Sequence, residues 1–223
     1  MRSQSPRPER RAEALSKERI VETAIAILDA EGAGGLTVRT LAARLATGSG
    51  AIYWHVADKD ELLAAATDQV IAEALAPQGE DASPRQVIRA VALAVFDAVD
   101  AHPWIGAQLS GDPWQYAVLR ILEAVGAQVT ALGLPEPALF NATTALLSFM
   151  LGLAGQYAVR SRRFAACADR TLVLRTVAEQ WAQLDPARHP FVRQVALMLP
   201  DHDDREQFLA GIDLVLAGID ANR

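Results

Sequence analysis

Apolar residues recur at intervals of three and four positions through the first part of the chain, and this spacing predicts amphipathic helices. The first apolar face lies behind Ser16, a favourable N-cap residue, and comprises Ile20, Val21, Ala24, Ile27 and Leu28. Glycines at positions 32, 34 and 35 predict the end of this helix. A second, shorter face lies behind Thr37 and comprises Val38, Leu41, Ala42 and Leu45. The pattern therefore predicts one helix over residues 16–31 and a second helix that begins at residue 37.

The helical spacing breaks at Thr47-Gly48-Ser49-Gly50, because two glycines and two hydroxyl residues favour a turn over a helix interior. Residues 51–56 form an aromatic-rich run that, as a helix, would be too short to be stable unless it docks on its neighbours. Asp58 then predicts the N-cap of a long helix that reaches about residue 76, and Glu61 completes an acidic capping pair. A helix, a four-residue turn and a short exposed helix form a helix-turn-helix, whose second helix enters the major groove of DNA.

A small apolar core should hold these helices together. We expect it to combine the apolar face of residues 16–31 with Leu41, Leu45, Ile52 and Trp54. Trp54 is therefore predicted to pack inside and not to face the solvent.

The stretch from residue 17 to residue 75 resembles the tetracycline-repressor (TetR) family of bacterial transcription regulators. The resemblance rests on four motifs, namely EG-x-x-GLT from Glu31, LAARL from Leu41, IYWHV from Ile52 and DKDELL from Asp58. This sequence departs from the family pattern in the turn, where Thr47 replaces an apolar residue and two glycines make the turn loose. The resemblance implies a dimeric repressor that binds a palindromic operator in double-stranded DNA and is released by a small-molecule inducer.

The remainder of the chain is predicted to be helical as well, since no segment alternates in the manner of strands. Ser83-Pro84 opens a helix that ends near residue 101, and Asp112-Pro113 opens another that ends near residue 132. The helix over residues 136–159 is apolar almost all round, and the last helix, over residues 204–221, has a wide apolar face. Because such helices are buried on two sides, we expect both to pack against their copies in a homodimer, as the resemblance to the family also implies.

These elements predict an all-α fold, in which an N-terminal three-helix head that binds DNA is joined by a long helix to a C-terminal helical domain for ligand binding and dimerisation. We place the head at residues 16–63 and the C-terminal domain at residues 64–223, with a linker at residues 77–81. Residues 1–15 are rich in Arg, Pro and Ser, which favours a disordered tail. A basic arm that touches DNA phosphates or the minor groove is the alternative.

The net charge of −6 is at first sight unfavourable for binding DNA, so its distribution matters. Residues 1–63 contain 9 Lys and Arg and 9 Asp and Glu, whereas the remaining 160 residues contain 12 and 18. No carboxylate occurs between Gly32 and Ala57, a stretch that includes Arg39, Arg44 and His55. The acidic excess therefore belongs to the C-terminal domain, and the helix-turn-helix can lie against phosphates.

Composition also indicates the compartment. No apolar run reaches the roughly 18 residues that a membrane span requires, and the polar, arginine-rich N-terminus does not resemble a secretion signal. The single cysteine, Cys167, excludes an intramolecular disulfide and fits a reducing compartment. We therefore expect a cytoplasmic protein that does not associate with a membrane.

Nine residues of the helix-turn-helix are candidates for contact with DNA: Thr37, Arg39, Thr47, Ser49, Gly50, Ala51, Tyr53, His55 and Lys59. The guanidinium of Arg39 can donate two hydrogen bonds to a guanine edge, and the matching position contacts bases in some TetR members. The small residues 49–51 allow close approach to bases, although turn chemistry alone would also explain them. The candidates for phosphate contacts, which fix the register without reading sequence, are Thr37, Tyr53, His55 and Lys59. If one of the two ring residues belongs to the core instead, we expect it to be His55.

The C-terminal domain has no comparable motif, but polar and aromatic residues interrupt its apolar helices. The candidates for a small-molecule pocket are Trp104, Tyr116, Arg120, Glu123, Asn141, Thr144, Gln156, Tyr157 and Trp181. A role in the core, in a cap or on the surface is the alternative for each. The resemblance to the family implies that some of them line an inducer site.

No cofactor and no metal site are expected. The run Asp201-His202-Asp203-Asp204 directly precedes a helix, where acidic residues cap free N–H groups and complement the helix dipole. His189 and Cys167 have no partners at the spacing of metal ligands.

An enzyme is not expected either, because no G-x-S-x-G motif occurs and no Cys/His pairing is evident. The alternative to a transcription regulator is a protein–protein adaptor built on a helix-turn-helix that has lost DNA binding. The loose turn and the scarcity of lysine would fit such an adaptor. The inducer and the operator sequence are not readable from the chain.

Overall fold

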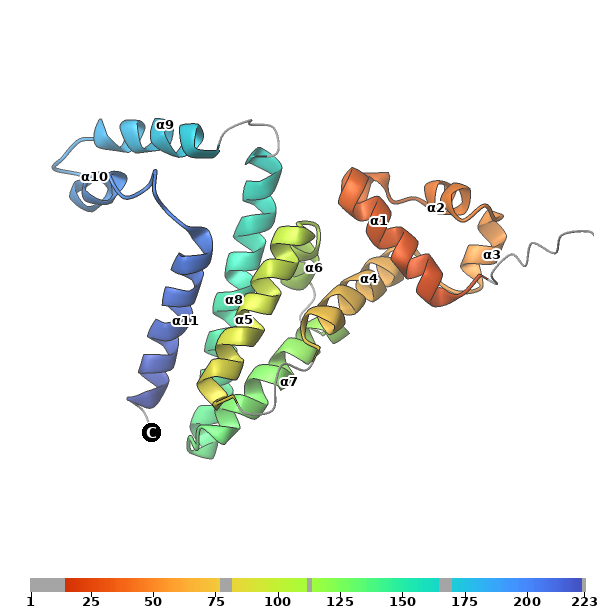
Figure 1. The fold of residues 1–223 in the computed structure, drawn as a ribbon, viewed down its shortest axis with the longest axis horizontal. Coiled ribbons are helices and arrows are strands. Elements are labelled where there is room, and N and C mark those ends of the chain that lie inside the picture. Colours follow the sequence, from red (N-terminus) through yellow and green to blue (C-terminus); the bar gives the residue numbers. More distant parts are fainter. Residues whose placement is uncertain (1–14, 77–81, 112–113, 165–169, 222–223) are drawn as a thin grey trace, which may run out of the picture. The chain divides into compact units, whose positions relative to one another are not determined.

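The computed structural model describes residues 15–76, 82–111, 114–164 and 170–221, except for the side chains of residues 154 and 157–164. These residues form helices and connecting turns, and they contain no strand (Figure 1). The prediction of an all-α fold is therefore confirmed. The chain divides into two compact units, Met1–Ala66 and Thr67–Arg223.

The first unit contains α1 (Lys17–Gly35), α2 (Val38–Arg44), α3 (Ser49–Tyr53) and the beginning of α4 (Lys59–Ala74). Ser16 caps α1 as predicted, since its hydroxyl accepts a hydrogen bond from the N–H of Arg19 at 3.3 Å. Gly32 interrupts the helix with a φ of 68°, a conformation that glycine adopts without strain. The regular part of α1 thus ends next to residue 31, where the glycines predict its end.

The core of this unit forms from one face of each helix. Its buried residues include Ile20, Val21, Ala24, Ile27, Leu28, Leu41, Ile52, Leu62 and Leu63. The prediction for Trp54 is wrong, because its side chain is 89% exposed. Ile52 and Val56, four residues apart, occupy the inward positions. Trp54 lies about 200° around the helix from Ile52 and therefore faces outward.

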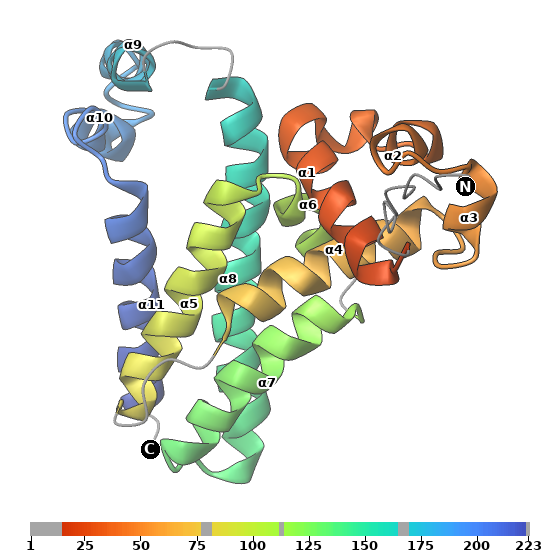
Figure 2. The ribbon, with the colours of Figure 1, turned by 45° about the vertical axis from the view of Figure 1, so that its right-hand side comes forward.

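The second unit contains the end of α4 together with α5 (Pro84–Ala101), α6 (Ile105–Gly111), α7 (Tyr116–Ala131), α8 (Glu136–Phe164), α9 (Arg170–Ala182), α10 (Pro190–Ala196) and α11 (Asp204–Asp220). Helices α5, α8 and α11 run side by side, and α7 packs against α5 and α8 (Figures 1 and 2). Their shared core contains the buried residues Ile88, Val95, Val99, Ile121, Val125, Leu146, Met150, Phe208 and Ile212. Helices α9 and α10 pack on each other.

Most helix boundaries in the second unit lie within a few residues of the predicted ones. Ser83 caps α5 in a capping box with Gln86, as the Ser-Pro pair predicts. Helix α7 begins at Tyr116, later than predicted, and α8 continues to Phe164, beyond the predicted end at residue 159. The predicted linker at residues 77–81 and all but the last residue of the predicted tail at residues 1–15 lie outside the described part of the chain.

Three ion pairs join α5 to α11 along their antiparallel contact, Arg85 with Asp220, Arg89 with Asp213, and Asp97 with Arg205. Between them, the rings of Phe96 and Phe208 lie 5.2 Å apart. Because exposed ion pairs contribute little to stability, the apolar contacts hold α11 in place and the ion pairs favour one register.

One side of α8 and of α11 stays uncovered in the single chain. Phe140 on α8 is 73% exposed, and Leu214 on α11 is 76% exposed. The predicted burial of these helices on two sides is therefore not reached within one chain. Among the described helices, none combines the length and the apolarity needed to cross a membrane.

Candidate nucleic-acid interface

Hydrogen bonds in the first turn fix the position of α2. Thr37 Oγ1 accepts the N–H of Thr40 at 3.1 Å, and Thr40 Oγ1 accepts the N–H of Thr37 at 3.0 Å, which makes a capping box. The hydroxyl of Thr40 also donates to the carbonyl oxygen of Gly35 at 2.8 Å. Arg39 is exposed on the helix held in this way, and its guanidinium has no ion-pair partner among the described residues.

The turn between α2 and α3 is closed by the backbone. The N–H of Thr47 donates to the carbonyl oxygen of Ala42 at 3.0 Å, and Ala46 takes a φ of 51°, a left-handed conformation that is uncommon for alanine. Helix α3 begins at Ser49, two residues earlier than predicted, so Ser49 and Gly50 form its first turn. Both are exposed, which leaves this end of α3 open to close approach.

Helix α3 presents two aromatic side chains to the solvent. Tyr53 is 57% and Trp54 is 89% exposed, whereas Ile52 is 1% exposed and His55 is half-buried. Exposed large apolar side chains that lie together mark contact surfaces. Trp54 therefore joins the candidate DNA-contacting residues, although the sequence pattern predicts it in the core.

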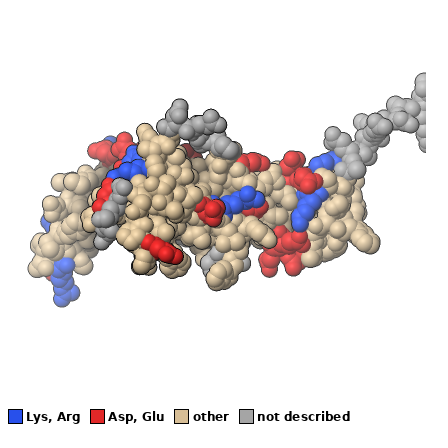
Figure 3. Space-filling view, turned by 90° about the horizontal axis from the view of Figure 1, so that it is seen from below, with Lys and Arg blue, Asp and Glu red and all other residues tan. Residues whose placement is uncertain are grey.

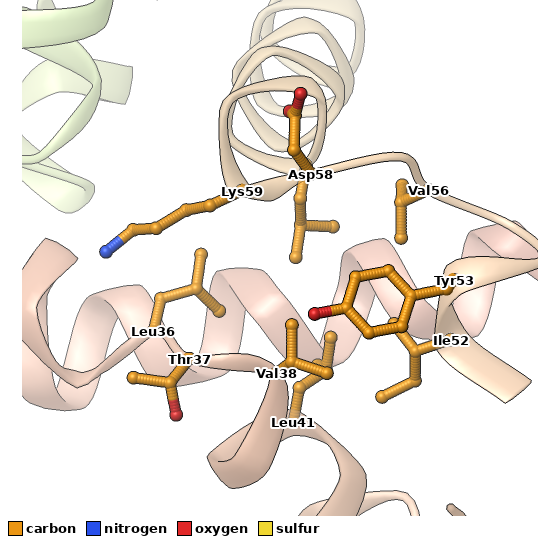
Figure 4. A pocket seen from close by; sticks show the side chains of 10 residues that line it. Leu36, Thr37, Val38, Leu41, Ile52, Tyr53, Val56, Asp58 and Lys59 are labelled. Carbon is orange, nitrogen blue, oxygen red and sulfur yellow. The ribbon is translucent and has the colours of Figure 1, made fainter. Parts of the chain in front are cut away.

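A small apolar gap of about 20 Å³ lies between α2, α3 and the start of α4 (Figure 4). Its walls are Leu36, Val38, Leu41, Ile52, Val56 and Leu62, with Thr37, Tyr53, Asp58 and Lys59 around them. A gap of this size accommodates about one water molecule, so it is not a ligand site. The ring of Tyr53 leans across the gap (Figure 4), which holds α3 against α2 while more than half of the side chain stays exposed.

Glu61 ties the start of α4 to α1. Its carboxylate accepts the N–H of Ala57 at 2.7 Å and the ammonium of Lys17 at 2.7 Å. These two contacts, the backbone one first, lower the pKa of Glu61. Asp58 accepts the N–H of Glu61 at 2.8 Å, as its predicted role at the helix N-terminus requires. The base on which α2 and α3 rest is thus fixed by charged hydrogen bonds.

Charges around the helix-turn-helix are mixed. Arg44 pairs with Glu31 at 2.9 Å, and Lys59 Nζ donates to the carbonyl oxygen of Ala33 at 2.6 Å. An ammonium has three N–H donors, so Lys59 keeps two for a phosphate. On the face shown in Figure 3, Lys and Arg lie in small groups beside Asp and Glu, with uncharged surface between them. The candidate interface is therefore defined by the exposed side chains of α2 and α3.

The described residues that are predicted to form a ligand pocket lie at different places in the second unit. Among them only Glu123 lines a cavity of about 410 Å³ that lies between the end of α4, α5 and α7. Arg120 instead pairs with Asp68 on α4. Trp104 is 6% exposed and lies edge-on to His102, whereas Tyr116 is 76% exposed.

The other pocket candidates lie on α8 and α9. Asn141 and Gln156 are exposed, and Trp181 is half-buried. The hydroxyl of Thr144 donates to the carbonyl oxygen of Phe140 at 2.7 Å, which occupies it within its own helix. The side chain of Tyr157 lies outside the described part of the chain.

The cavity could not be found from the sequence because alanines form most of its wall. Its lining comprises Ala74, Leu75, Ala76, Ala82, Gln86, Val87, Ala90, Val91, Ala94, Glu123, Ala124, Ala127 and Gln128. A small apolar residue gives no chemical signal, and only the packing of the three helices shows that these positions face one space.

The acidic run before α11 caps the helix. Asp203 accepts the N–H of Glu206 at 2.8 Å, which lowers the pKa of Asp203 and agrees with the capping interpretation. Asp204 accepts a hydrogen bond from Arg170 Nη2 at 2.8 Å and lies 2.8 Å from His202 Nε2. In the part of the chain that the structure describes, no three His, Cys, Asp or Glu side chains are grouped to hold a metal ion.

Two family descriptions match this chain. "Bacterial regulatory proteins, tetR family" matches residues 20–66, and "Tetracyclin repressor-like, C-terminal domain" matches residues 76–223. Among curated proteins, the HTH-type transcriptional repressor DrrR1 of Streptomyces coeruleorubidus is 29% identical over 98% of this chain and 80% of its own length.

Solved structures resemble the chain over most of its length. The TetR transcriptional regulator SCO7222 from Streptomyces coelicolor is 51% identical, with a TM-score of 0.83 over 94% of this chain and 100% of its own. ActR from Streptomyces coelicolor in complex with actinorhodin is 25% identical, with a TM-score of 0.76 over 93% of this chain and 98% of its own. BioQ with its double-stranded DNA operator is 29% identical, with a TM-score of 0.56 over 68% of this chain and 94% of its own.

Proposed function

Because this chain belongs to the TetR family of bacterial regulatory proteins, we propose that it is a ligand-responsive transcriptional repressor that binds a palindromic DNA operator as a homodimer. Residues 16–63 serve as the DNA-binding domain, and residues 64–223 serve as the domain for ligand binding and dimerisation. The protein acts in the cytoplasm, and its proposed role contains no catalytic step.

The outward face of α3 is the observation that carries this proposal. Small exposed residues open the helix, and Tyr53 and Trp54 project from it. An α-helix fits the major groove of B-form DNA, where the small residues at its start can approach bases and Ala51 can contact a thymine methyl group. Arg39 on α2 is free to bind a guanine edge. BioQ, whose fold is similar over two thirds of this chain, is named as a complex with its operator.

The remaining candidates position the protein on the DNA backbone. The residues proposed to contact phosphates are Thr37, Thr47, Tyr53, His55 and Lys59. Trp54 offers an apolar surface to sugars or thymine methyl groups beside them. Contacts of this kind fix the register of α3 in the groove without reading sequence.

Dimerisation through α8 and α11 would cover the exposed apolar side chains Phe140 and Leu214. Two helix-turn-helix units in one dimer reach successive major grooves when their centres lie about 34–36 Å apart. An inducer that binds one spacing of the two heads more tightly than another shifts the dimer between DNA-binding and released states. Helix α4, which begins in the first unit and ends in the second, is the proposed connection between ligand and DNA.

The adaptor alternative is not favoured. Small exposed residues open α3, and among the described residues Arg39 beside it has no ion-pair partner, which suits binding to DNA. The curated relative DrrR1, which is similar to this chain over nearly its full length, is named as a transcriptional repressor.

Selection of genomic DNA by the purified full-length protein tests the proposal. Sequenced fragments should share an inverted repeat whose half-sites lie about one helical turn apart. A mobility-shift assay should show that the wild-type protein binds such a fragment and that a Tyr53→Ala/Trp54→Ala variant binds it much more weakly. Fragments without a common repeat, or equal binding by the double variant, would contradict the proposal.

A further inference from the structure

The cavity between α4, α5 and α7 is large enough for a small molecule. Its volume of about 410 Å³ lies within the roughly 300–1,000 Å³ typical of ligand pockets. Helix α5 lines it with Gln86, Val87, Ala90, Val91 and Ala94, and α7 lines it with Glu123, Ala124, Ala127 and Gln128. The positions on each helix are spaced one helical turn apart, so each helix presents one continuous face to the cavity.

Short side chains lie on both faces of this space, Ala90 and Ala94 on α5 and Ala124 and Ala127 on α7. On their other faces the same two helices bury large residues, such as Ile88, Ile121 and Val125. The alanines that face the cavity have no side chain beyond Cβ and leave the space between the two helices unfilled. The wall of the cavity is therefore mostly apolar.

Glu123 is the one charged residue among the described residues that line this cavity. It has no ion-pair partner in the described part of the chain. The preceding cation on the same helix is Arg120, one turn earlier, and it is engaged elsewhere. Its Nε lies 2.5 Å from Asp68 Oδ1 and its Nη2 lies 3.2 Å from Asp68 Oδ2. The charge of Glu123 is therefore available to a ligand.

Two carboxamides add polar contacts to the same wall. Gln86 Oε1 accepts hydrogen bonds from the N–H and the hydroxyl of Ser83, both at 2.8 Å. This capping box fixes the orientation of the side chain and leaves its NH₂ group to donate. Gln128 lies on α7 in the same lining as Glu123 and can donate or accept.

We propose that this cavity binds an organic monocation, whose apolar body lies against the alanine walls and whose ammonium group lies beside the Glu123 carboxylate. A cation gains the attraction of an uncompensated carboxylate, whereas an anion of the same shape meets a like charge. The idea that this ligand is the inducer rests on the proposed function. Binding to the cavity does not require DNA and can be measured by itself.

Three probes that share one apolar body and differ in charge test the proposal. Isothermal titration of the full-length protein at pH 7 would compare 2-(1-naphthyl)ethylamine, 2-(1-naphthyl)ethanol and 1-naphthylacetate. We expect the amine to bind about fivefold more tightly than the alcohol, the upper end for a partly exposed ion pair, and the acetate to bind more weakly than the alcohol.

Variants test whether the preference for the amine over the alcohol arises from Glu123 and the cavity wall around it. Glu123→Gln should make the amine and the alcohol bind alike, whereas Glu179→Gln, at an exposed position on α9, should leave the preference intact. Ala127→Leu, or Ala90→Leu if the former unfolds on heating, should weaken binding of the amine and the alcohol by filling the cavity. A preference for the amine that survives Glu123→Gln, no preference in the wild type, or undiminished binding in both leucine variants would overturn the proposal.

A separate titration with the operator fragment distinguishes this proposal from the proposed function. If the wild-type protein without ligand does not bind the operator fragment but still prefers the amine, the repressor function alone is contradicted. If the wild-type protein binds the operator fragment but does not prefer the amine over the alcohol, the cation site alone is contradicted.

Discussion

At the scale of single residues, the proposed interface depends on a few side chains that the fold leaves free. Arg39 is exposed and has no ion-pair partner among the described residues, whereas Arg44, five residues later, pairs with Glu31. Sequence alone cannot separate these two arginines, because both lie in the same carboxylate-free stretch. The difference arises from the fold, which brings Glu31 of α1 close to Arg44.

Replacing Arg39 by alanine should weaken operator binding by roughly 1–3 kcal/mol and relax the preference at one base position. The reason is the loss of a two-donor contact with a guanine edge. Fluorescence anisotropy on the selected fragment and on its single-base variants would measure both effects. Arg175→Ala, at an exposed position on α9, is the control and should change neither. Unchanged affinity and unchanged base preference in Arg39→Ala would show that the assigned role is wrong.

Ile52 and Trp54 should separate stability from DNA binding. Ile52 is 1% exposed, so Ile52→Ala should lower the free energy of unfolding by roughly 2–4 kcal/mol, as urea titration would show. Trp54 is 89% exposed, so Trp54→Ala should leave stability within about 0.5 kcal/mol and still reduce operator affinity. A Trp54→Ala protein with lower stability and normal operator affinity would contradict this role and show that Trp54 belongs to the core.

At the scale of elements, capping residues were the most informative part of the sequence. The residue types at the N-caps predict the starts of α1, α2 and α5. In the structure each of these side chains, Ser16, Thr37 and Ser83, accepts a backbone N–H hydrogen bond. The start of α3 was predicted less well, because its N-cap Gly48 provides no side-chain hydrogen bond. The first turn of α3 is held by the backbone bond from the N–H of Ala51 to the carbonyl oxygen of Gly48, and a backbone bond of this kind has no side-chain signature in the sequence.

Gly211 allows α11 to pack closely on α8. A Cβ atom at this position would lie 2.1 Å from Phe149 Cζ, and the Phe149 ring is held by stacking on Phe208 at 5.7 Å. Gly211→Ala should therefore destabilise the protein by about 1–3 kcal/mol in thermal or urea unfolding. Phe149→Leu in the same chain should recover part of this loss by making room. The control is Gly126→Ala, where the nearest atom lies 3.6 Å away and a stability equal to or above wild type is expected.

At the scale of the whole molecule, the sequence predicted the helical fold and its two-part organisation in outline, but not the cavity. Apolar periodicity predicts which face of a helix is buried. It predicts the apolar helices that carry Phe140 and Leu214, two side chains that a single chain leaves exposed. The alanines that line the cavity are indistinguishable by type from those that fill the core. Their role follows from the distance between α5 and α7, which depends on residues far apart in the chain.

The proposed dimer makes Leu214 a sensitive position. Leu214 is 76% exposed on α11, so Leu214→Glu should not unfold the chain but should place two charges against an apolar partner surface. Sedimentation velocity at micromolar concentration should show a dimer for the wild type and mainly monomer for this variant. Leu197→Glu, 83% exposed and outside α8 and α11, is the control and should remain dimeric. A monomeric wild type would contradict the proposed assembly.

Protection of guanine N7 from dimethyl sulfate on the selected operator fragment tests most directly whether two copies of α3 occupy major grooves. N7 lies in the major groove, so a helix seated there shields it. We expect two protected patches on one face of the DNA, about one helical turn apart, with one guanine in each patch regaining reactivity when Arg39→Ala is bound. A bound protein that leaves N7 reactive in both half-sites, or that protects a single patch, would contradict this expectation.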